Sequence, residues 1–396
     1  MMRTPVLFVA MQTDAQSNGG VESLTQIALN AQRIRPILLT NIHSSRTARW
    51  REAGLETHVA PLGFSEGLNA RQKPAARALA YLRYARIIRR LMNDTGIRLV
   101  HVNDPLAMQL ALVPVRMQPG GRLTFNIRDT LDPGRSPSRF KYGVLFAAAD
   151  HTFFLSREMA DYWAPYSRSL RDRSSVTYSV VDPTHFQPGG PTAEERTPMV
   201  LVTGVVREKK GQLAFLEHVA PAVVAGGARL VFAGDFDPER DAYAAACARA
   251  AAPLGSAVSF LGFRRDLPDL IRAAAVVAIP SGHEGLVRVM IEAMACSRPV
   301  VSFDVCSARE ILEREAPGAG VVVATGDHVG MSEALIRFCN DPVARAAAGA
   351  AGLAGAQRLF DPASVVARYE DVLIRLAGKS GLQSPTYGAE ERSCAA

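Results

Sequence analysis

Two glutamates and the loop that begins at the first of them carry the clearest chemistry in the sequence. Glu284 lies in a polar loop that follows an apolar run ending at Ser281, and a helix is expected to begin near Leu286. The dipole and free backbone N–H groups of a helix start favour anions. This loop, including Gly285 and Leu286, is therefore expected to contact a negatively charged ligand.

Glu292 lies about a turn and a half into the same expected helix, among apolar neighbours. A carboxylate in such surroundings needs partners, because burying an unpaired charge is costly. Its two oxygens could accept both hydroxyls of a ribose, which would leave Glu284 beside the group attached to the far phosphate. The alternative is that Glu284 is a solvated loop residue and that Glu292 pairs with Arg288 or Arg298.

Lys210 is the cation best placed to serve such a ligand. It follows the apolar run at 199–204, and ligands bind at the carboxyl ends of strands in parallel sheets. A nucleotide diphosphate in a cleft needs cations, and Lys210 would provide one. The alternative is that Arg207, Lys209 and Lys210 form a solvated turn.

The elements that position these residues follow a repeating pattern. Short apolar runs without polar alternation recur between helical stretches, at 6–10, 35–40, 57–62, 98–102, 122–127 and 151–156, and again at 199–204, 228–234, 257–262, 275–281, 298–304 and 320–324. Such runs are typical of parallel strands buried on both faces. A chain of 396 residues exceeds one ordinary core. The sequence predicts an α/β protein with two Rossmann-like, doubly wound domains facing across a cleft, at 1–187 and 199–362, joined by a Pro- and Gly-rich linker at 188–198.

Composition excludes several classes of protein. Five cysteines without CxxC spacing argue against a disulfide framework or a zinc site and favour a reducing cytoplasm. No apolar run approaches the roughly 20 residues needed to span a bilayer. Residues 378–396 have little to bury and are expected to form a disordered tail.

These motifs together resemble glycosyltransferase family 4, whose members are retaining enzymes with the GT-B fold. Residues 284–301 resemble the family's E-x7-E element and the EAMA-x-x-x-PVV run that follows, and 204–211 resemble its G-R-L-x-x-x-K-G element. The stretches 230–235, 260–263 and 266–274 lie in the family's order between them. The family's arginine is Val205 here, so one phosphate contact is either missing or supplied by Arg207.

The resemblance extends to the first domain. Gly19 and Gly20 resemble the family's Gly-Gly loop, where backbone N–H groups approach phosphate and acceptor. Asn103 replaces a histidine of the family's pattern, and Arg128 stands where the family often has a histidine that reaches the donor sugar. The alternative is that Arg128 is an ion-pair partner of Asp129 or Asp132.

The resemblance implies transfer of a hexose from a UDP- or GDP-sugar to a hydroxyl of a glycan or lipid-linked glycan, with retention at the anomeric carbon. Glu284, Arg128 and Lys210 would act in catalysis, and a helix at 363–377 would cross back to the first domain. Neither a cofactor nor a metal is expected, although Asp235 and Asp237 spell a DxD sequence. The alternatives are a nucleotide-sugar epimerase or hydrolase and, in another class, a two-domain ligand-binding protein. Nucleic acid is not an expected partner, because no recognition motif is present.

The positive charge lies in the first half of the chain. Residues 1–185 contain 24 Lys and Arg against 14 Asp and Glu. The segment 67–93 has seven cations and no acid, and at helical spacing Arg83, Arg86 and Arg90 share one side while Leu79, Leu82 and Ile87 are expected to face the core. We expect a cytoplasmic protein with peripheral contact to an anionic membrane at its inner face. The alternative is a solvated basic helix without a partner.

Overall fold

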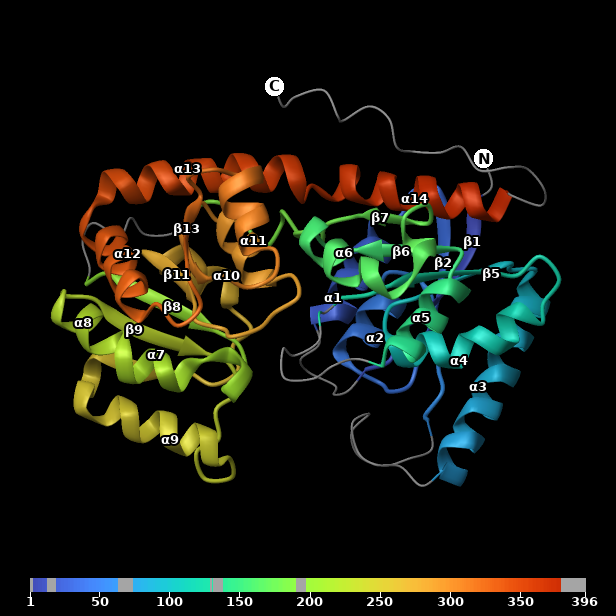
Figure 1. Cartoon of the computed structure of the whole chain (residues 1–396), viewed down its shortest axis with the longest axis horizontal. Coiled ribbons are helices and arrows are strands. Elements are labelled where there is room, and N and C mark those ends of the chain that lie inside the picture. The colour runs from blue at the N-terminus through green and yellow to red at the C-terminus, as the bar shows by residue number, and fades with distance from the viewer. Residues whose placement is uncertain are drawn as a thin grey trace.

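Two parallel β-sheets organise the chain in the computed structural model, which describes residues 3–12, 19–62, 74–128, 130, 138–189 and 197–378 (Figure 1). The first sheet has the strand order β3-β2-β1-β4-β5-β6-β7. Its strands are β1 (Thr4–Val9), β2 (Ile34–Thr40), β3 (Glu56–Val59), β4 (Leu99–Val102), β5 (Arg122–Asn126), β6 (His151–Phe154) and β7 (Ser174–Val176).

The second sheet has the order β10-β9-β8-β11-β12-β13. Its strands are β8 (Met199–Thr203), β9 (Arg229–Ala233), β10 (Val258–Phe260), β11 (Val276–Ile279), β12 (Val300–Phe303) and β13 (Gly320–Val323). Residues 190–196 of the expected linker and 379–396 of the expected tail lie outside the described residues.

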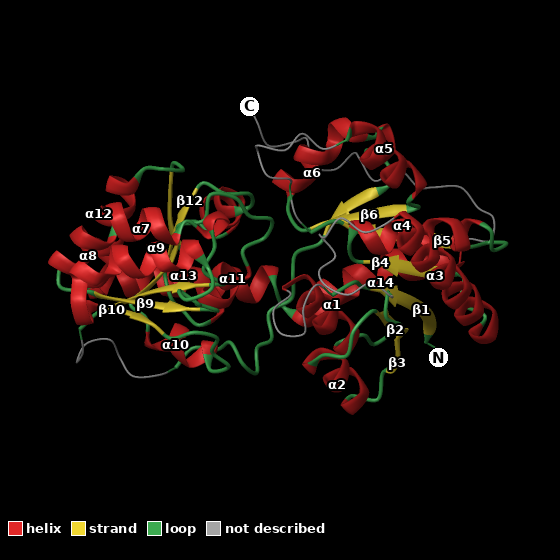
Figure 2. Ribbon diagram, turned by 90° about the horizontal axis from the view of Figure 1, so that it is seen from below, coloured by secondary structure: helices red, strands yellow, loops and turns green. Residues whose placement is uncertain are grey.

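Helices cover both faces of each sheet (Figure 2). In the first domain they are α1 (Gly19–Leu29), α2 (Ser45–Glu52), α3 (Pro74–Thr95), α4 (Pro105–Arg116), α5 (Arg139–Ala148) and α6 (Arg157–Trp163). In the second they are α7 (Gln212–His218), α8 (Ala220–Ala225), α9 (Ala242–Ala251), α10 (Leu267–Ala273), α11 (Arg288–Ala295), α12 (His328–Asn340) and α13 (Pro342–Leu359), followed by α14 (Pro362–Gly378).

The predicted fold class is confirmed, and β1 shows why its sequence suits a central parallel strand. Leu7 and Val9 enter a core beneath α3, α4 and α5, while Val6 and Phe8 enter a core beneath α1, α2 and α14. Successive side chains of a strand point to opposite faces, so a strand buried on both faces must be apolar throughout.

The last helix, α14, packs against the first domain. Figure 1 shows α13 and α14, in red, running along one side of the molecule from the second domain to the first. The Tyr369 ring stacks on Phe153 at 4.1 Å, and its hydroxyl lies 2.8 Å from the Asn126 side chain and 3.2 Å from His101 Nε2. The Glu370 carboxylate accepts the backbone N–H groups of Gln32, Arg33 and Ile34. Buried aromatic and charged contacts therefore anchor the end of the chain.

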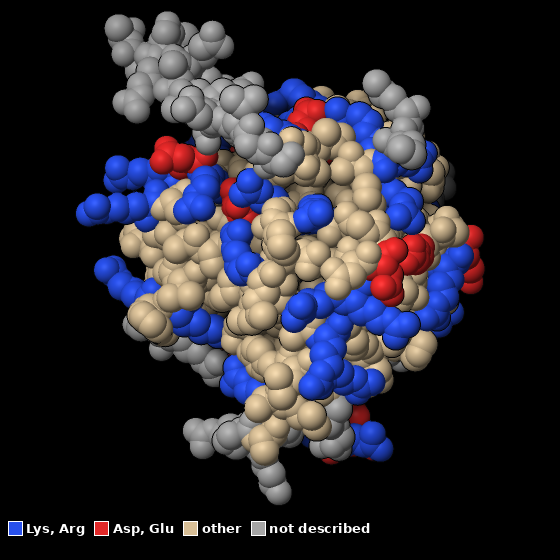
Figure 3. All heavy atoms as spheres, turned by 90° about the vertical axis from the view of Figure 1, so that its right-hand side faces the viewer, with Lys and Arg blue, Asp and Glu red and all other residues tan. Residues whose placement is uncertain are grey.

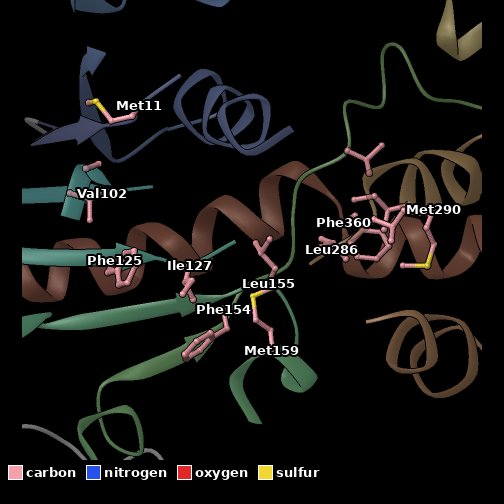
Figure 4. Close-up of a cluster of buried hydrophobic side chains, with 14 of the residues drawn as sticks. Met11, Val102, Phe125, Ile127, Phe154, Leu155, Met159, Leu286, Met290 and Phe360 are labelled. Carbon is pink, nitrogen blue, oxygen red and sulfur yellow. The ribbon is translucent and has the colours of Figure 1, made fainter. Parts of the chain in front are cut away.

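Apolar and polar contacts join the domains. One buried cluster includes Phe154 and Met159 of the first domain and Met290 of the second (Figure 4). Glu310, the first residue of the π-helical turn Glu310–Glu315, accepts the backbone N–H groups of Arg157 (3.0 Å) and Glu158 (2.9 Å). Glu158 in turn accepts the N–H of Ser307 at 2.7 Å. These reciprocal bonds join the start of α6 to residues 307–310 across the domain interface.

One sequence prediction about α3 is wrong. Leu79 and Leu82, expected to face the core, are 64% and 54% exposed. The core-facing side of α3 instead carries Ala80, Tyr84, Ile88, Leu91 and Met92. Sequence spacing did not separate the two faces, because apolar residues occur on both. No described helix is long and apolar enough to cross a membrane.

Candidate functional site

A cavity of about 520 Å³ opens between the two domains. Its walls come from segments that follow β5, β6, β8, β9 and β11, where ligands bind in parallel α/β sheets. The first domain contributes Gly20, Glu22, Arg46, Arg128 and Leu155. The charged residues from the second domain are Lys210, Asp235, Arg264, Glu284, Arg288 and Glu292.

Lys210 and Glu284 meet in this cavity. Lys210 ends the one-turn helix Glu208–Lys210 after β8, and its Nζ lies 2.5 Å from Glu284 Oε1. The turn requires Gly211, whose φ is +71° and whose missing side chain would strike the carbonyl oxygen of Pro280. Close packing of this turn on the end of β11 therefore sets the position of the lysine.

Helix α11 begins at Arg288, about two residues later than the sequence predicts, and Glu292 lies on its second turn. Arg288 donates to Glu292 Oε1 at 2.8 Å, which is the ion pair that the alternative interpretation of Glu292 invokes. Both side chains line the cavity, and among the described residues no second partner of the Glu292 carboxylate is present. Its second oxygen remains available to a hydroxyl donor.

A chain of hydrogen bonds extends from this pair across the domain interface. Its links are Arg288 to Ser23 (3.0 Å), Ser23 to Ser179 (3.1 Å), Arg128 to Ser179 (3.3 Å), Arg128 to Asn103 (3.4 Å) and Asn103 to the carbonyl oxygen of Gly20 (3.0 Å). The residues that resemble the family's motifs in the two domains are thus connected through side chains.

Arg128 follows β5, and part of its surface opens to the cavity. Burial lowers the pKa of its guanidinium to about 10, with the nearby Arg288 acting in the same direction. The guanidinium remains charged at neutral pH. Asp129 and Asp132, its alternative partners, lie outside the described residues.

The structure brings most of the predicted site residues together. Arg128, Lys210 and the predicted residues of the loop and helix at 284–292 all line the cavity, as does Gly20. Gly19 is the first residue of α1, directly before Gly20. Arg207 is exposed and outside the wall, because it caps the turn in an extended conformation, so the structure does not support its role as the replacement for the arginine missing at Val205.

The cavity residues that were missed or discounted in the sequence include three with charged side chains, Arg46, Arg264 and Asp235. Arg46, at the start of α2, reaches the wall beside Glu22 at 3.6 Å, and only the fold brings this segment to the cleft. Arg264 directly follows the FLGF stretch, whose place in the family's order was the available signal. Asp235, discounted with the DxD sequence, lines the cavity, while Asp237 lies outside it beside Arg240.

Comparison with known proteins identifies the class of enzyme. Residues 197–341 match the family described as "Glycosyl transferases group 1". The chain is 28% identical over 268 residues to the lipopolysaccharide core biosynthesis mannosyltransferase LpsB of Rhizobium meliloti, covering 59% of this chain and 74% of LpsB. It is 33% identical over 172 residues to a GDP-mannose-dependent phosphatidylinositol monomannoside mannosyltransferase of Corynebacterium glutamicum, covering 40% and 42% of the two chains.

Solved structures show the same fold over nearly the whole chain. Anabaena HepE, crystallised with UDP and glucose, superposes with a TM-score of 0.76 at 18% identity, covering 93% of this chain and 99% of HepE. Sucrose-phosphate synthase from Thermosynechococcus elongatus gives 0.75 at 18% identity, covering 94% and 99%. The chain is therefore a glycosyltransferase with the GT-B fold, and its second domain matches the group 1 glycosyl transferases.

Proposed function

We propose that the protein is a family 4 enzyme that transfers a hexose, with retention at the anomeric carbon, from a UDP- or GDP-sugar to a hydroxyl of a glycan or lipid-linked glycan. The observation that carries this proposal is the meeting of Lys210, Glu284 and Glu292 in the interdomain cavity. Relatives named as mannosyltransferases and a neighbour crystallised with UDP and glucose support this class of substrate.

In this proposal the second domain holds the donor. Lys210 neutralises the diphosphate together with the N–H groups of the loop before α11, including those of Gly285 and Leu286. Glu292 accepts the ribose hydroxyls, and Arg288 holds its carboxylate in place at 2.8 Å. Glu284 lies at the sugar end, where its ion pair with Lys210 links the sugar site to the diphosphate.

Retention would follow a front-face course. The cavity wall contains the carboxylates of Glu22, Asp235, Glu284 and Glu292. Three of them are engaged with cations: Glu22 with Arg46, Glu284 with Lys210 and Glu292 with Arg288. We expect none of the four to act as a covalent nucleophile. The leaving diphosphate would accept the proton of the acceptor hydroxyl, and the fixed charges around it would stabilise the transition state.

A donor screen tests the proposal. Thermal unfolding is measured with UDP, GDP, ADP and their sugars, because a ligand at 100 times its dissociation constant adds about 2.7 kcal/mol of stability. We expect one base to dominate and the matching sugar nucleotide to react only with acceptor, giving a product of retained anomeric configuration by NMR. Release of free sugar or an epimer without acceptor would favour the hydrolase or epimerase alternative. Inverted product would contradict retention.

We also propose that the first domain contacts an anionic membrane through the outer face of α3. Leu79 and Leu82 are exposed there beside Arg83, Arg86 and Arg90. The neighbouring helices carry further exposed apolar residues, Val113 and Met117 at the end of α4 and Phe140 and Val144 on α5. Figure 3 shows Lys and Arg spread over this end of the molecule, with few Asp or Glu.

Charge complementarity supports an anionic bilayer as the partner, since each cation near an anionic leaflet contributes about 1 kcal/mol. Flotation with phosphatidylglycerol vesicles at low and high salt tests this surface. We expect salt-sensitive binding that is lost in Leu79→Ser/Leu82→Ser and in Arg83→Gln/Arg86→Gln/Arg90→Gln. The control is Val329→Ser/Val343→Ser, which removes equally exposed apolar residues from the second domain. Binding unchanged in both α3 variants, or absent at low salt, would overturn the proposal.

A further inference from the structure

Arg128 differs from the other cations of the cavity in its ion-pair and hydrogen-bond partners. Lys210 lies 2.5 Å from Glu284, Arg288 2.8 Å from Glu292, Arg264 2.8 Å from Asp266 and Arg46 3.6 Å from Glu22. Among the described residues, Arg128 has no carboxylate partner, and its two hydrogen bonds go to the neutral side chains of Asn103 and Ser179.

The surroundings of Arg128 make the lack of a carboxylate partner among the described residues unfavourable for the stability of the folded protein. Burial lowers its pKa, and the positive charge of Arg288 lowers it further. A cation enclosed by protein without a countercharge is destabilising unless a ligand supplies the charge. Because part of the guanidinium faces the cavity, an anion bound there can reach it.

Hydrogen bonds also hold the guanidinium group of Arg128 in a fixed orientation. Nη1 donates to Asn103, which itself donates to the carbonyl oxygen of Gly20 at 3.0 Å, and Nη2 donates to Ser179, which bonds Ser23 at 3.1 Å. A planar guanidinium fixed in this way suits bidentate recognition of a carboxylate or phosphate. The bonds at 3.3 and 3.4 Å are long, so they position the group without replacing an anionic partner.

We propose that Arg128 forms an anion-binding subsite on the first-domain wall, which takes a carboxylate or phosphate carried by the transferred sugar or by the acceptor. This inference rests on the proposed function, because it takes the diphosphate to be held by Lys210 and the loop before α11. The two sources of the anion are a uronic acid in the donor and a phosphorylated sugar in the acceptor. A neutral sugar with a neutral acceptor would leave the half-buried Arg128 without an anionic partner among the ligand and the described residues.

The test compares Arg128→Gln and Arg128→Lys with Arg264→Gln, which removes a cavity arginine that already has a carboxylate partner. Calorimetry measures the affinity for UDP or GDP, for the neutral sugar nucleotide and for the uronic acid analogue with the same base. Kinetics compare phosphorylated and neutral acceptors. Thermal shifts with glucuronate and with inorganic phosphate probe the subsite even if no nucleotide binds, so failure of the donor assignment is detected separately.

We expect Arg128→Gln to change nucleoside diphosphate affinity less than about twofold and to weaken the charged sugar or acceptor about tenfold or more, with partial recovery in Arg128→Lys. A loss confined to the uronic acid nucleotide assigns the anion to the donor, and a loss confined to the phosphorylated acceptor assigns it to the acceptor. Equal losses for charged and neutral ligands, weaker binding of the diphosphate itself, or unchanged binding throughout would overturn the proposal.

A structural role for Arg128 predicts a different result. In that case Asp129→Asn or Asp132→Asn would lower the melting temperature as much as Arg128→Gln does, and glucuronate and phosphate would stabilise the wild type and Arg128→Gln equally. This combination would also overturn the subsite. If the subsite exists, the aspartate variants keep the discrimination between charged and neutral ligands.

Discussion

The two walls of the cavity differ in how their charges are balanced. On the second-domain wall, Lys210 and Arg288 each lie within 2.8 Å of a cavity carboxylate, so the wall is internally neutralised before a ligand arrives. On the first-domain wall, Arg128 faces the same space with neutral partners among the described residues. Donor binding would therefore replace existing ion pairs of the second-domain wall with contacts to the ligand. An anion bound at Arg128 would replace no ion pair among the described residues.

The cores of the two domains also differ, in the number of polar side chains that they bury. Beneath α14, the first sheet buries His101 between Thr124 (2.9 Å) and Tyr369 (3.2 Å), and His151 lies near the same cluster. The buried polar side chains of the second sheet are fewer, and Ser302 is the one within its strands. A titratable core makes the first domain the acid-sensitive part of the molecule.

The largest predicted effect is therefore a loss of stability of the first domain at low pH. Burial lowers the pKa of His101 to about 3 and that of His151 to about 4. Below about pH 6.5 these histidines therefore bind protons in the unfolded chain but stay neutral in the folded one, so the folded state loses stability. Burial raises the pKa of Asp104 to about 6, which opposes this trend by stabilising the fold as pH falls from 6 towards 3.8.

At pH 4.5 the two histidines outweigh the aspartate, and we expect a net loss on the order of 3 kcal/mol. Hydrogen exchange measured at pH 7 and 4.5 should show the first sheet opening before the second. His43→Gln, at an exposed position of the first domain, is the control and should leave the acid response unchanged. Simultaneous opening of both sheets would contradict the comparison.

The next effect is on the donor wall. Lys210→Ala removes a cation from the diphosphate and leaves Glu284 buried without its partner, so we expect about a hundredfold loss of kcat/KM and of donor affinity. Lys209→Ala, one residue earlier and outside the cavity wall, is the matched control. Equal behaviour of the two variants would mean that the turn, rather than the Lys210 charge, is what matters.

The sequence predicted the second-domain wall better than the first, and the reason is physical. Lys210, Glu284 and Glu292 lie at strand ends and at one helix start, where parallel sheets place ligands, so local pattern and topology agree. Arg46 depends on the way α1 and α2 pack against each other, which no local pattern encodes. Arg207 shows the opposite limit, because it lies only three residues before Lys210 and yet is exposed outside the cavity wall.

The limit of local sequence patterns also explains the wrong prediction for Leu79 and Leu82 on α3. Its basic side was visible in the sequence, but Leu79 and Leu82 resembled core positions because helical spacing alone does not show which apolar stripe faces the sheet. Small residues and an aromatic, Ala80 and Tyr84, fill the contact instead, and Tyr84 donates its hydroxyl to the carbonyl of Ala60. Tertiary packing selected between two stripes that the sequence left nearly equivalent.

A smaller effect is expected where the two walls meet. Arg288→Gln leaves Glu292 without its ion-pair partner and removes the donor to Ser23, so we expect about a tenfold loss of kcat/KM for the donor. Ser23→Ala removes the bond across the interface and the bond to Ser179 but keeps the ion pair of Glu292, and it should cost about threefold or less. Measuring donor affinity for both variants separates the roles: a larger loss in Ser23→Ala than in Arg288→Gln would show that the interface, and not the ribose carboxylate, limits binding.

The smallest expected effect tests whether the donor wall needs a metal ion in addition to its fixed cations. We propose that it does not, because Lys210 and the loop before α11 already line the place where a diphosphate would lie. Asp235 lines the cavity, so it is the carboxylate best placed to contradict this. We expect EDTA and Asp235→Asn each to change the rate by less than about twofold, well below the several kcal/mol that a metal contributes to charge stabilisation. Asp237→Asn, outside the wall, is the matched control. Activity that EDTA abolishes and Mn²⁺ or Mg²⁺ restores, together with its loss in Asp235→Asn alone, would show that the fixed cations of the second-domain wall are not sufficient.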